Sequence, residues 1–131
     1  MHTSYFTTHC NKIMSQISLE DCTEENPSLL IVDDDTVFCS VLAKAMTKRG
    51  FQVVCAHSIE DALGLCESAT TEYAIVDLKL SNESGLVLVE KLKALDPGTR
   101  IVMLTGYASI ATAIEAIKLG ATHYLAKPVD A

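Results

Sequence analysis

Carboxylates that follow two apolar segments are the residues of this sequence best suited to chemistry. Asp77 follows the apolar residues 73–76, and three more acids follow the apolar residues 29–32: Asp33, Asp34 and Asp35. Both segments are typical of buried strands in a parallel sheet, whose carboxyl ends meet at one edge. Clustered carboxylates repel one another unless a cation neutralises them. Oxygen ligands favour Mg²⁺, which leaves room for a phosphoryl group, so the pattern predicts metal-dependent phosphoryl chemistry.

Two further polar side chains are expected at the same edge. Thr105 follows the apolar residues 101–104, and Lys127 follows residues 122–126. A polar residue after a strand is often only a helix cap, and we expect that role for Asp35. Lys127 is a cation and therefore a poor cap for a helix amino terminus. The joint pattern favours a phosphate site at this edge.

Strand and helix patterns alternate from residue 28 onward. Apolar segments predict five strands, at residues 29–32, 51–56, 73–76, 101–104 and 122–126. Apolar residues at helical spacing predict four helices, at residues 37–49, 58–66, 86–95 and 110–119. This alternation predicts an α/β fold of the flavodoxin-like type, with a doubly wound parallel sheet in the order 2-1-3-4-5. The last helix of such a fold is missing from the sequence, so we expect apolar surface to be exposed beside the fifth strand.

Composition indicates one acidic globular domain behind a polar leader. The 131 residues carry a formal net charge of −7, which argues against a nucleic-acid-binding surface. Residues 1–27 lack a clear period and are predicted to be a flexible leader, and residues 28–131 form the predicted domain. We expect buried, reduced thiols at Cys39, Cys55 and Cys66. There is no apolar run of about 20 residues and no signal peptide, so a cytoplasmic location is expected.

Four motifs give the sequence a specific resemblance. LLIVDDD, YAIVDLKL, IVMLTG and HYLAKP occur in this order within residues 28–129. This segment resembles the receiver domain of bacterial two-component response regulators. Within that family it looks similar to the RegA/PrrA/ActR group of redox-responsive global regulators.

The resemblance implies a phosphoryl-acceptor site with Mg²⁺ as its cofactor. Asp77 would be the phosphoacceptor and a metal ligand. Asp34 would bind Mg²⁺ directly, and Asp33 would hold it partly through water. The backbone carbonyl of Lys79 would complete the protein ligands.

The resemblance also implies a switch. Thr105 and Lys127 would contact the phosphoryl group, and Tyr124 would turn inward with Thr105. The Lys127–Pro128 bond is typically cis in this family. The movement would change the face formed by the fourth helix and the fifth strand.

The same resemblance implies partners and limits. A sensor histidine kinase would donate the phosphoryl group. The domain would not be a classical enzyme, but self-phosphorylation and self-dephosphorylation at Asp77 would be expected. A homodimer could form through the fourth-helix and fifth-strand face, and DNA would be bound only by an output domain outside this chain.

The missing helix suggests an excised fragment or a gap filled by a partner chain. Lys79 lies where the family tunes dephosphorylation, so the phosphoryl lifetime is not predicted.

Two rival interpretations involve other protein classes. Residues 33–37 also fit the D-x-D-x-[T/V] motif of haloacid-dehalogenase-type phosphatases, with Asp33 as nucleophile and Asp35 as general acid and base. That interpretation leaves Asp77 without a role, and only Asp130 remains downstream for a second acidic pair. A flavin or nucleotide binder would share the fold, but the sequence has no glycine-rich phosphate motif.

Overall fold

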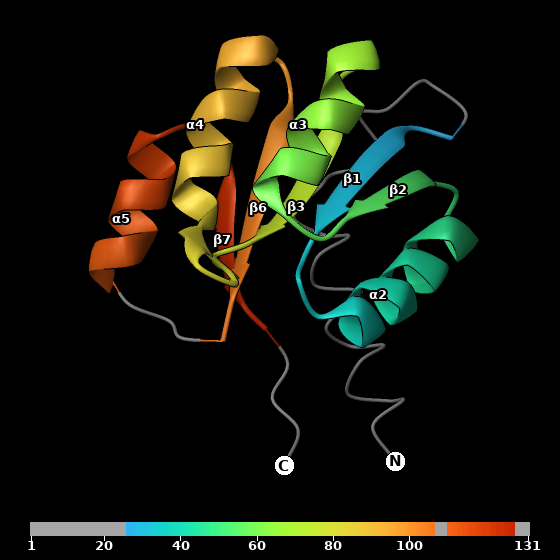
Figure 1. The fold of residues 1–131 in the computed structure, drawn as a ribbon, viewed down its shortest axis with the longest axis horizontal. Coiled ribbons are helices and arrows are strands. Elements are labelled where there is room, and N and C mark those ends of the chain that lie inside the picture. Colours follow the sequence, from blue (N-terminus) through green and yellow to red (C-terminus); the bar gives the residue numbers. More distant parts are fainter. Residues whose placement is uncertain (1–25, 107–109, 128–131) are drawn as a thin grey trace.

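A five-stranded parallel sheet forms the centre of the computed structural model, which describes residues 26–106 and 110–127 (Figure 1). The strands are β1 (Ser28–Val32), β2 (Gln52–Ala56), β3 (Tyr73–Asp77), β6 (Arg100–Thr105) and β7 (His123–Ala126). They lie in the order β2-β1-β3-β6-β7, and every neighbouring pair is parallel. Counted along the chain, this is the order 2-1-3-4-5, so the predicted fold class is confirmed.

Four helices lie on the two faces of this sheet. They are α2 (Thr36–Lys48), α3 (Ile59–Ser68), α4 (Gly85–Leu95) and α5 (Ile110–Lys118). α2 begins where the Asp35 side chain accepts a hydrogen bond from the Phe38 amide at 3.0 Å, which confirms the predicted cap. α3 begins in the same way, with Ser58 accepting from the Asp61 amide.

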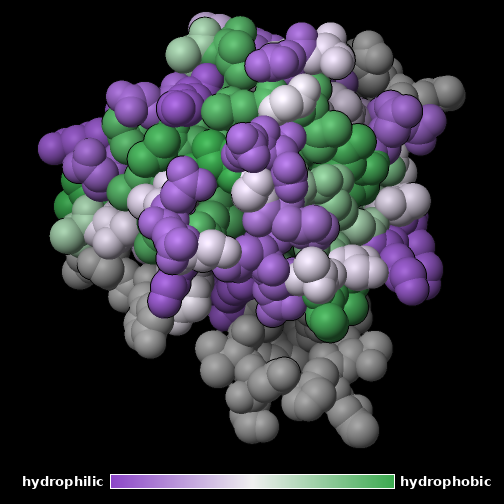
Figure 2. Space-filling model, viewed as in Figure 1, coloured by the Kyte–Doolittle hydropathy of each residue, from purple (hydrophilic) through white to green (hydrophobic). Residues whose placement is uncertain are grey.

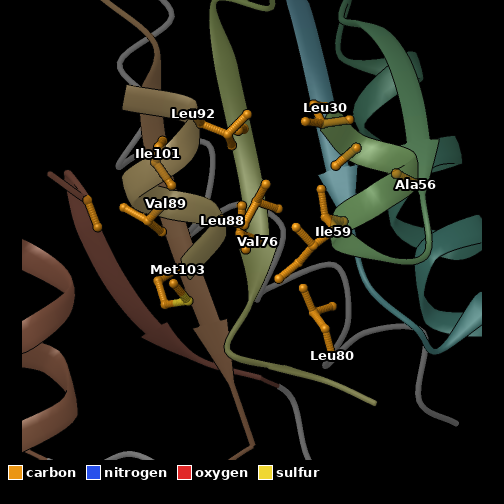
Figure 3. Close-up of a cluster of buried hydrophobic side chains, with 14 of the residues drawn as sticks. Leu30, Ala56, Ile59, Val76, Leu80, Leu88, Val89, Leu92, Ile101 and Met103 are labelled. Atoms are coloured by element: carbon orange, nitrogen blue, oxygen red, sulfur yellow. The ribbon is translucent and has the colours of Figure 1, made fainter. Parts of the chain in front are cut away.

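The two faces carry separate apolar clusters. The three-helix face packs α3, α4 and α5 against alternate residues of the strands, among them Leu30, Val76, Ile101 and Met103 (Figure 3). The α2 face packs α2 against the residues between them: Leu29, Ile31, Tyr73, Ile75, Val102, Leu104 and Leu125. Outside these cores, hydrophilic residues are interspersed with hydrophobic ones over the surface seen in Figure 2. The helices described here include none long and apolar enough to cross a membrane.

A small hairpin after β3 was not predicted from the sequence. β4 (Lys79–Leu80) and β5 (Glu83–Ser84) pair antiparallel and connect β3 to α4. The turn places Ser81 at φ 55°, in the left-handed region. Strands of two residues leave no apolar period, which is why this hairpin was not recognised.

The expectation of exposed apolar surface beside the fifth strand is wrong. No helix follows β7 within the described residues, yet Val102, Leu104 and Leu125 are only 3, 1 and 8% exposed. These side chains belong to the same apolar cluster as the buried residues of α2, to which β1 and β3 connect them.

Three of the five cysteines lie among the described residues and are free thiols. Cys39 and Cys66 are buried, and Cys55 is half-buried. Burial, with the neighbouring Cys55, raises the pKa of the Cys39 thiol to about 12. Burial also raises the pKa of Cys66. This agrees with the prediction of buried, reduced thiols.

Candidate functional site

Three carboxylates meet at the carboxyl edge of the sheet. One oxygen from each of Asp33, Asp34 and Asp77 lies within 4.8 Å of the other two. Asp33 and Asp77 are 1 and 6% exposed, whereas Asp34 faces solvent. β1 and β3 are adjacent in the sheet, and this adjacency brings residues 44 positions apart to one place. The predicted acidic cluster is therefore present.

Asp33 is held in one orientation by its surroundings. Its amide donates to the Ala56 carbonyl at 3.1 Å, and its Oδ1 accepts from the Asp35 amide at 2.9 Å. Its own carbonyl oxygen lies 3.0 Å from His57 Nδ1. The Ala56 carbonyl and the His57 ring therefore hold the backbone of Asp33, and the Asp35 amide orients its carboxylate.

Lys127 bridges the two buried carboxylates. Its Nζ lies 2.9 Å from Asp33 Oδ2 and 3.4 Å from Asp77 Oδ2. The ammonium also sits 4.6 Å from the centre of the Phe38 ring, a cation–π contact. Burial lowers the pKa of this lysine, but the two carboxylates more than offset that effect, so its pKa is raised. Lys127 is thus a firmly charged group within the cluster.

The surroundings of Asp77 make its ionised form less favourable than that of a free carboxylate. Burial and the charge of Asp33 raise its pKa to about 6, although Lys127 and the Lys79 amide act in the opposite direction. A single ammonium does not fully neutralise the buried carboxylates. A divalent cation beside them would favour the ionised form of Asp77.

The donor set fits a hard divalent cation. Asp33 Oδ2 is fully buried and, among the described residues, has the Lys127 ion pair but no hydrogen bond. A carboxylate oxygen can take more than one partner, so Asp33 Oδ2 can contact a cation as well as Lys127. Carboxylate oxygens are also the ligands that Mg²⁺ and Ca²⁺ prefer.

The hairpin after β3 supplies site residues that sequence reasoning missed. Ser81 donates to Asp34 Oδ2 from its amide at 2.8 Å and from its hydroxyl at 3.1 Å. Gly85 lies so close to β3 that a Cβ there would collide with the carbonyl of Asp77. Its amide donates to the Leu78 carbonyl at 2.6 Å. A glycine at the start of a helix is unfavourable by propensity, and this was the available signal for a close approach.

The remaining predicted residues lie around this cluster. Thr105 ends β6 and is buried, and its carbonyl accepts from the Lys127 amide at 2.6 Å. Tyr124 is half-buried in β7 and packs against the cluster of the three-helix face. Lys79 is exposed in β4, and only its amide is brought to Asp77. Pro128, and with it the predicted cis bond, lies outside the described residues.

Comparison with known proteins agrees with this site. Residues 29–131 match the response regulator receiver domain family. The chain belongs to that family. It is 50% identical over 107 residues to the photosynthetic apparatus regulatory protein RegA of Rhodovulum sulfidophilum, covering 82% of this chain and 58% of RegA. It is 47% identical over 111 residues to the acid tolerance regulatory protein ActR of Rhizobium meliloti, covering 85% of this chain and 57% of ActR.

A solved structure with the same fold carries the expected modification. A response regulator from Burkholderia pseudomallei, crystallised with a phosphorylated aspartic acid, a calcium ion and citrate, matches at a TM-score of 0.76 and 47% identity. The match covers 80% of this receiver and 62% of that chain. The receiver therefore spans little more than half the length of the curated regulators it resembles.

The rival phosphatase interpretation finds no support. The Asp35 side chain, which would be the general acid and base, is exposed and caps α2. Asp33, which would be the nucleophile, is buried beneath the Lys127 ion pair. The family match covers the whole sheet and points to a two-component receiver.

Proposed function

We propose that residues 28–131 form a receiver that takes a phosphoryl group from a sensor histidine kinase onto Asp77. The observation that carries this proposal is the meeting of three carboxylates within 4.8 Å beside Lys127, which pairs with two of them. The same proposal makes this a cytoplasmic signalling domain whose output lies elsewhere. The matches cover only 58% of RegA and 57% of ActR, which supports a further output region outside this chain.

In the proposed reaction, a carboxylate oxygen of Asp77 attacks the phosphorus of a phosphohistidine. A new P–O bond forms in line with the breaking P–N bond, and the histidine leaves with the electron pair and takes up a proton. Such a transfer mainly requires positioning and neutralisation of charge on the equatorial oxygens. Lys127 Nζ, already 3.4 Å from Asp77, would pair with one of those oxygens.

The proposed cofactor is Mg²⁺. Asp33, Asp34 and Asp77 would hold it through carboxylate oxygens, and the carbonyl of Lys79 would be the fourth protein ligand. When bound, the ion neutralises the carboxylates and the incoming phosphoryl oxygens. Ser81 holds one carboxylate oxygen of Asp34 in place, which supports this arrangement.

The proposed switch links Asp77 to the three-helix face. Thr105 would hydrogen-bond the phosphoryl group, and Tyr124 would follow it inward. A phosphoryl group shifts the population only if it binds one arrangement better than the other. Ile114 and Ile117 are about half exposed on α5, beside β7, and would form part of a homodimer or output surface. DNA would be contacted only through an output domain.

The proposed kinase surface is α2. Val37 is 72% exposed and Val41 is 44% exposed, one turn apart on the helix that follows the acidic residues. Neighbours at this spacing share one side of a helix. An apolar patch of this kind beside the acceptor is suited to an apolar helix of the kinase.

The decisive experiment measures uptake of a phosphoryl mimic. Beryllofluoride and Mg²⁺ are added to wild type, Asp77→Asn and Asp35→Asn, and amide chemical shifts are followed by NMR. We expect Mg²⁺-dependent shifts at Thr105 and Tyr124 in wild type and in Asp35→Asn, because asparagine still caps α2. Asp77→Asn should show none of these shifts. Retained shifts in Asp77→Asn, with loss in Asp33→Asn, would move the acceptor to β1 and overturn the proposal.

A further inference from the structure

β2 is an edge strand whose outer side has no partner among the strands that the structure describes. It pairs with β1 alone, at one end of the order β2-β1-β3-β6-β7 (Figure 1). Residues 1–25, which include most of the predicted leader, lie outside the described residues. An edge strand of this kind offers a row of backbone donors and acceptors to another extended segment.

The backbone groups on the outer side of β2 belong to Val53 and Cys55. The Gln52 amide donates to the carbonyl of the residue before β1 at 2.9 Å. The Ala56 carbonyl accepts from the Asp33 amide at 3.1 Å. Successive residues of a strand direct their N–H and C=O groups to opposite sides, so the groups of Val53 and Cys55 point away from β1.

The β2 edge lacks the features that usually block strand addition. Edge strands are commonly protected by a charged side chain, a proline or a bulge. β2 has the sequence QVVCA, without charge or proline, and all five of its residues pair in register with β1. Val53 and Cys55 pack with the α2 cluster, and Val54, on the other side of the sheet, is 40% exposed. β2 is therefore open to strand addition and apolar on both sides.

A groove with a basic rim lies beside this edge. It has a volume of about 580 Å³ and is lined by α2, by β2 and by the residue that follows β2. Cys39, Ala43 and Cys55 form its floor, and the exposed Lys44 and Lys48 form its rim. Its other lining residues carry hydroxyl or imidazole groups, and none of the described residues that line it is acidic. The groove therefore favours a negatively charged occupant, although the chain as a whole carries a net charge of −7.

We propose that the β2 edge and this groove form a docking site for an extended acidic segment of a partner protein. The segment would add a strand to the sheet, with its backbone paired to Val53 and Cys55. Side chains of a strand alternate between its two faces. Glutamates on the α2 side would lay their methylene groups over the floor of the groove and bring their carboxylates to Lys44 and Lys48. Apolar residues on the other side would cover Val54.

Recognition of this kind divides affinity from specificity. Backbone hydrogen bonds to an exposed edge give affinity, and pockets for alternate side chains give specificity. Here the two lysines would select acidic residues at every second position of the partner. The inference does not rest on phosphoryl transfer, because it concerns the unmodified chain.

A second copy of this chain fits the edge less well. Two β2 strands related by a two-fold axis would pair antiparallel, and both α2 helices would lie on one face of the joined sheet. Lys44 and Lys48 of the two copies would then face each other across the junction. Like charges placed opposite one another are destabilising, whereas the same lysines attract an acidic strand.

The test uses the full chain and the peptide Glu-Val-Glu-Val-Glu-Val, acetylated and amidated at its ends. Affinity is measured by isothermal titration calorimetry, and exchange of the Val53 and Cys55 amides is measured by NMR. We expect both amides to exchange rapidly in the free protein and at least about tenfold more slowly with saturating peptide. The peptide Lys-Val-Lys-Val-Lys-Val should not bind, because the rim of the groove repels it.

Two substitutions test the groove. Lys44→Glu reverses a charge at its rim, and Lys91→Glu makes the same change in net charge on the exposed side of α4. We expect the Kd of the glutamate peptide to rise at least about fivefold in Lys44→Glu and to change less than about twofold in Lys91→Glu.

Two modified peptides test the strand pairing. N-methylation of the glutamates blocks the amides on one edge of the extended peptide, and N-methylation of the valines blocks those on the other edge. Because one edge alone would pair with β2, one modified peptide should bind and the other should not.

Several results would overturn the inference. Absence of binding at millimolar glutamate peptide would remove the proposed occupant. Slow exchange of the Val53 and Cys55 amides in the free protein would show that the edge is already covered, by another segment or, if a dimer is present, by a second copy. Equal binding of the two peptides, or equal effects of the two substitutions, would show that the groove does not select acidic residues. Equal effects of the two methylations would exclude strand pairing.

Discussion

The two faces of the sheet differ in the kind of residue they place at its carboxyl edge. On the α2 face, the strands end in charged groups: Asp33, Asp77 and Lys127. On the three-helix face, alternation places Thr105 and Tyr124, a hydroxyl and an aromatic residue. Tyr124 in β7 lies on the three-helix face, and Lys127, which follows β7 directly, lies with the two carboxylates. The sheet thus separates a face suited to chemistry from a face suited to transmitting a change of shape.

The two faces also differ in how completely their charged groups are neutralised. Burial and Asp33 raise the pKa of Asp77 to about 6, so the α2 face holds charge that it does not fully neutralise. The three-helix face is a continuous apolar cluster that includes the buried residues of three helices. Binding of a cation or a phosphoryl group should therefore alter the α2 face first, and the three-helix face through Thr105 and Tyr124.

Removal of the bridging ammonium should give the largest effect on stability. Lys127→Met leaves Asp33 and Asp77 facing each other in a buried site, so we expect a loss of about 3 kcal/mol in the free energy of unfolding at pH 7. Lys118→Met, an exposed lysine at the end of α5, should change it by less than about 0.5 kcal/mol. Urea denaturation measures both. Mg²⁺ should restore part of the loss in Lys127→Met, and equal losses in the two variants would contradict the strained-face interpretation.

Neutralisation of Asp77 should stabilise the folded state, the opposite of the effect of Lys127→Met. The folded pKa of Asp77 lies above its ordinary value of 3.8, so the folded state holds a proton that the unfolded state releases. The contribution of this group to stability is therefore lost as the pH rises from about 4 through 6. Asp77→Asn should be roughly 2 kcal/mol more stable than wild type at pH 8, and close to it at pH 4. If urea denaturation shows the same gain in stability for Asp77→Asn at pH 4 and pH 8, ionisation of Asp77 does not destabilise the folded state.

The position where α4 comes closest to β3, Gly85, has no room for a side chain. Gly85→Ala places a Cβ against the Asp77 carbonyl, and we expect a destabilisation of about 1–3 kcal/mol. Gly64→Ala is the matched control, because Gly64 lies in α3 with open space around it. It should stabilise the protein by up to about 1 kcal/mol. Thermal unfolding of both variants measures the difference, and equal changes in the two variants would contradict the close approach of Gly85 to the Asp77 carbonyl.

Sequence reasoning succeeded where the pattern is local and repeated. The five long strands, their order and the acidic cluster follow from apolar runs and from the rule that parallel strands end at one edge. The β4–β5 hairpin and the Ser81 contact with Asp34 were missed, because they depend on a backbone turn with no sequence period. The Phe38 contact with Lys127 joins residues far apart in sequence, and only the folded structure reveals it.

The error about exposed surface has a different origin. Strand–helix alternation predicts which helices follow which strands, and from it we expected apolar surface beside the fifth strand. Val102 and Leu104 are nevertheless buried, in the cluster that also holds the buried residues of α2. Alternation describes connections along the chain, but not how the side chains of neighbouring strands pack together.

The last prediction separates the two faces by their partners. Val37 on α2 and Ile117 on α5 are apolar residues whose side chains are 72 and 49% exposed. Their helices lie on opposite faces of the sheet. If the kinase docks beside the acceptor, Val37→Ser should slow phosphoryl transfer from a phosphorylated kinase by about tenfold, which corresponds to about 1.4 kcal/mol of binding free energy between kinase and receiver. Phosphorylation by a small phosphodonor should be unchanged, because that donor needs only the site.

Ile117→Ser provides the matched comparison for Val37→Ser. It should leave kinase transfer within about twofold of wild type and should weaken any dimer formed by the phosphorylated protein. Both variants remove one exposed apolar side chain, so a general loss of stability would affect them alike. Slower transfer in Ile117→Ser than in Val37→Ser would place the kinase on α5. The proposed kinase surface on α2 would then be wrong.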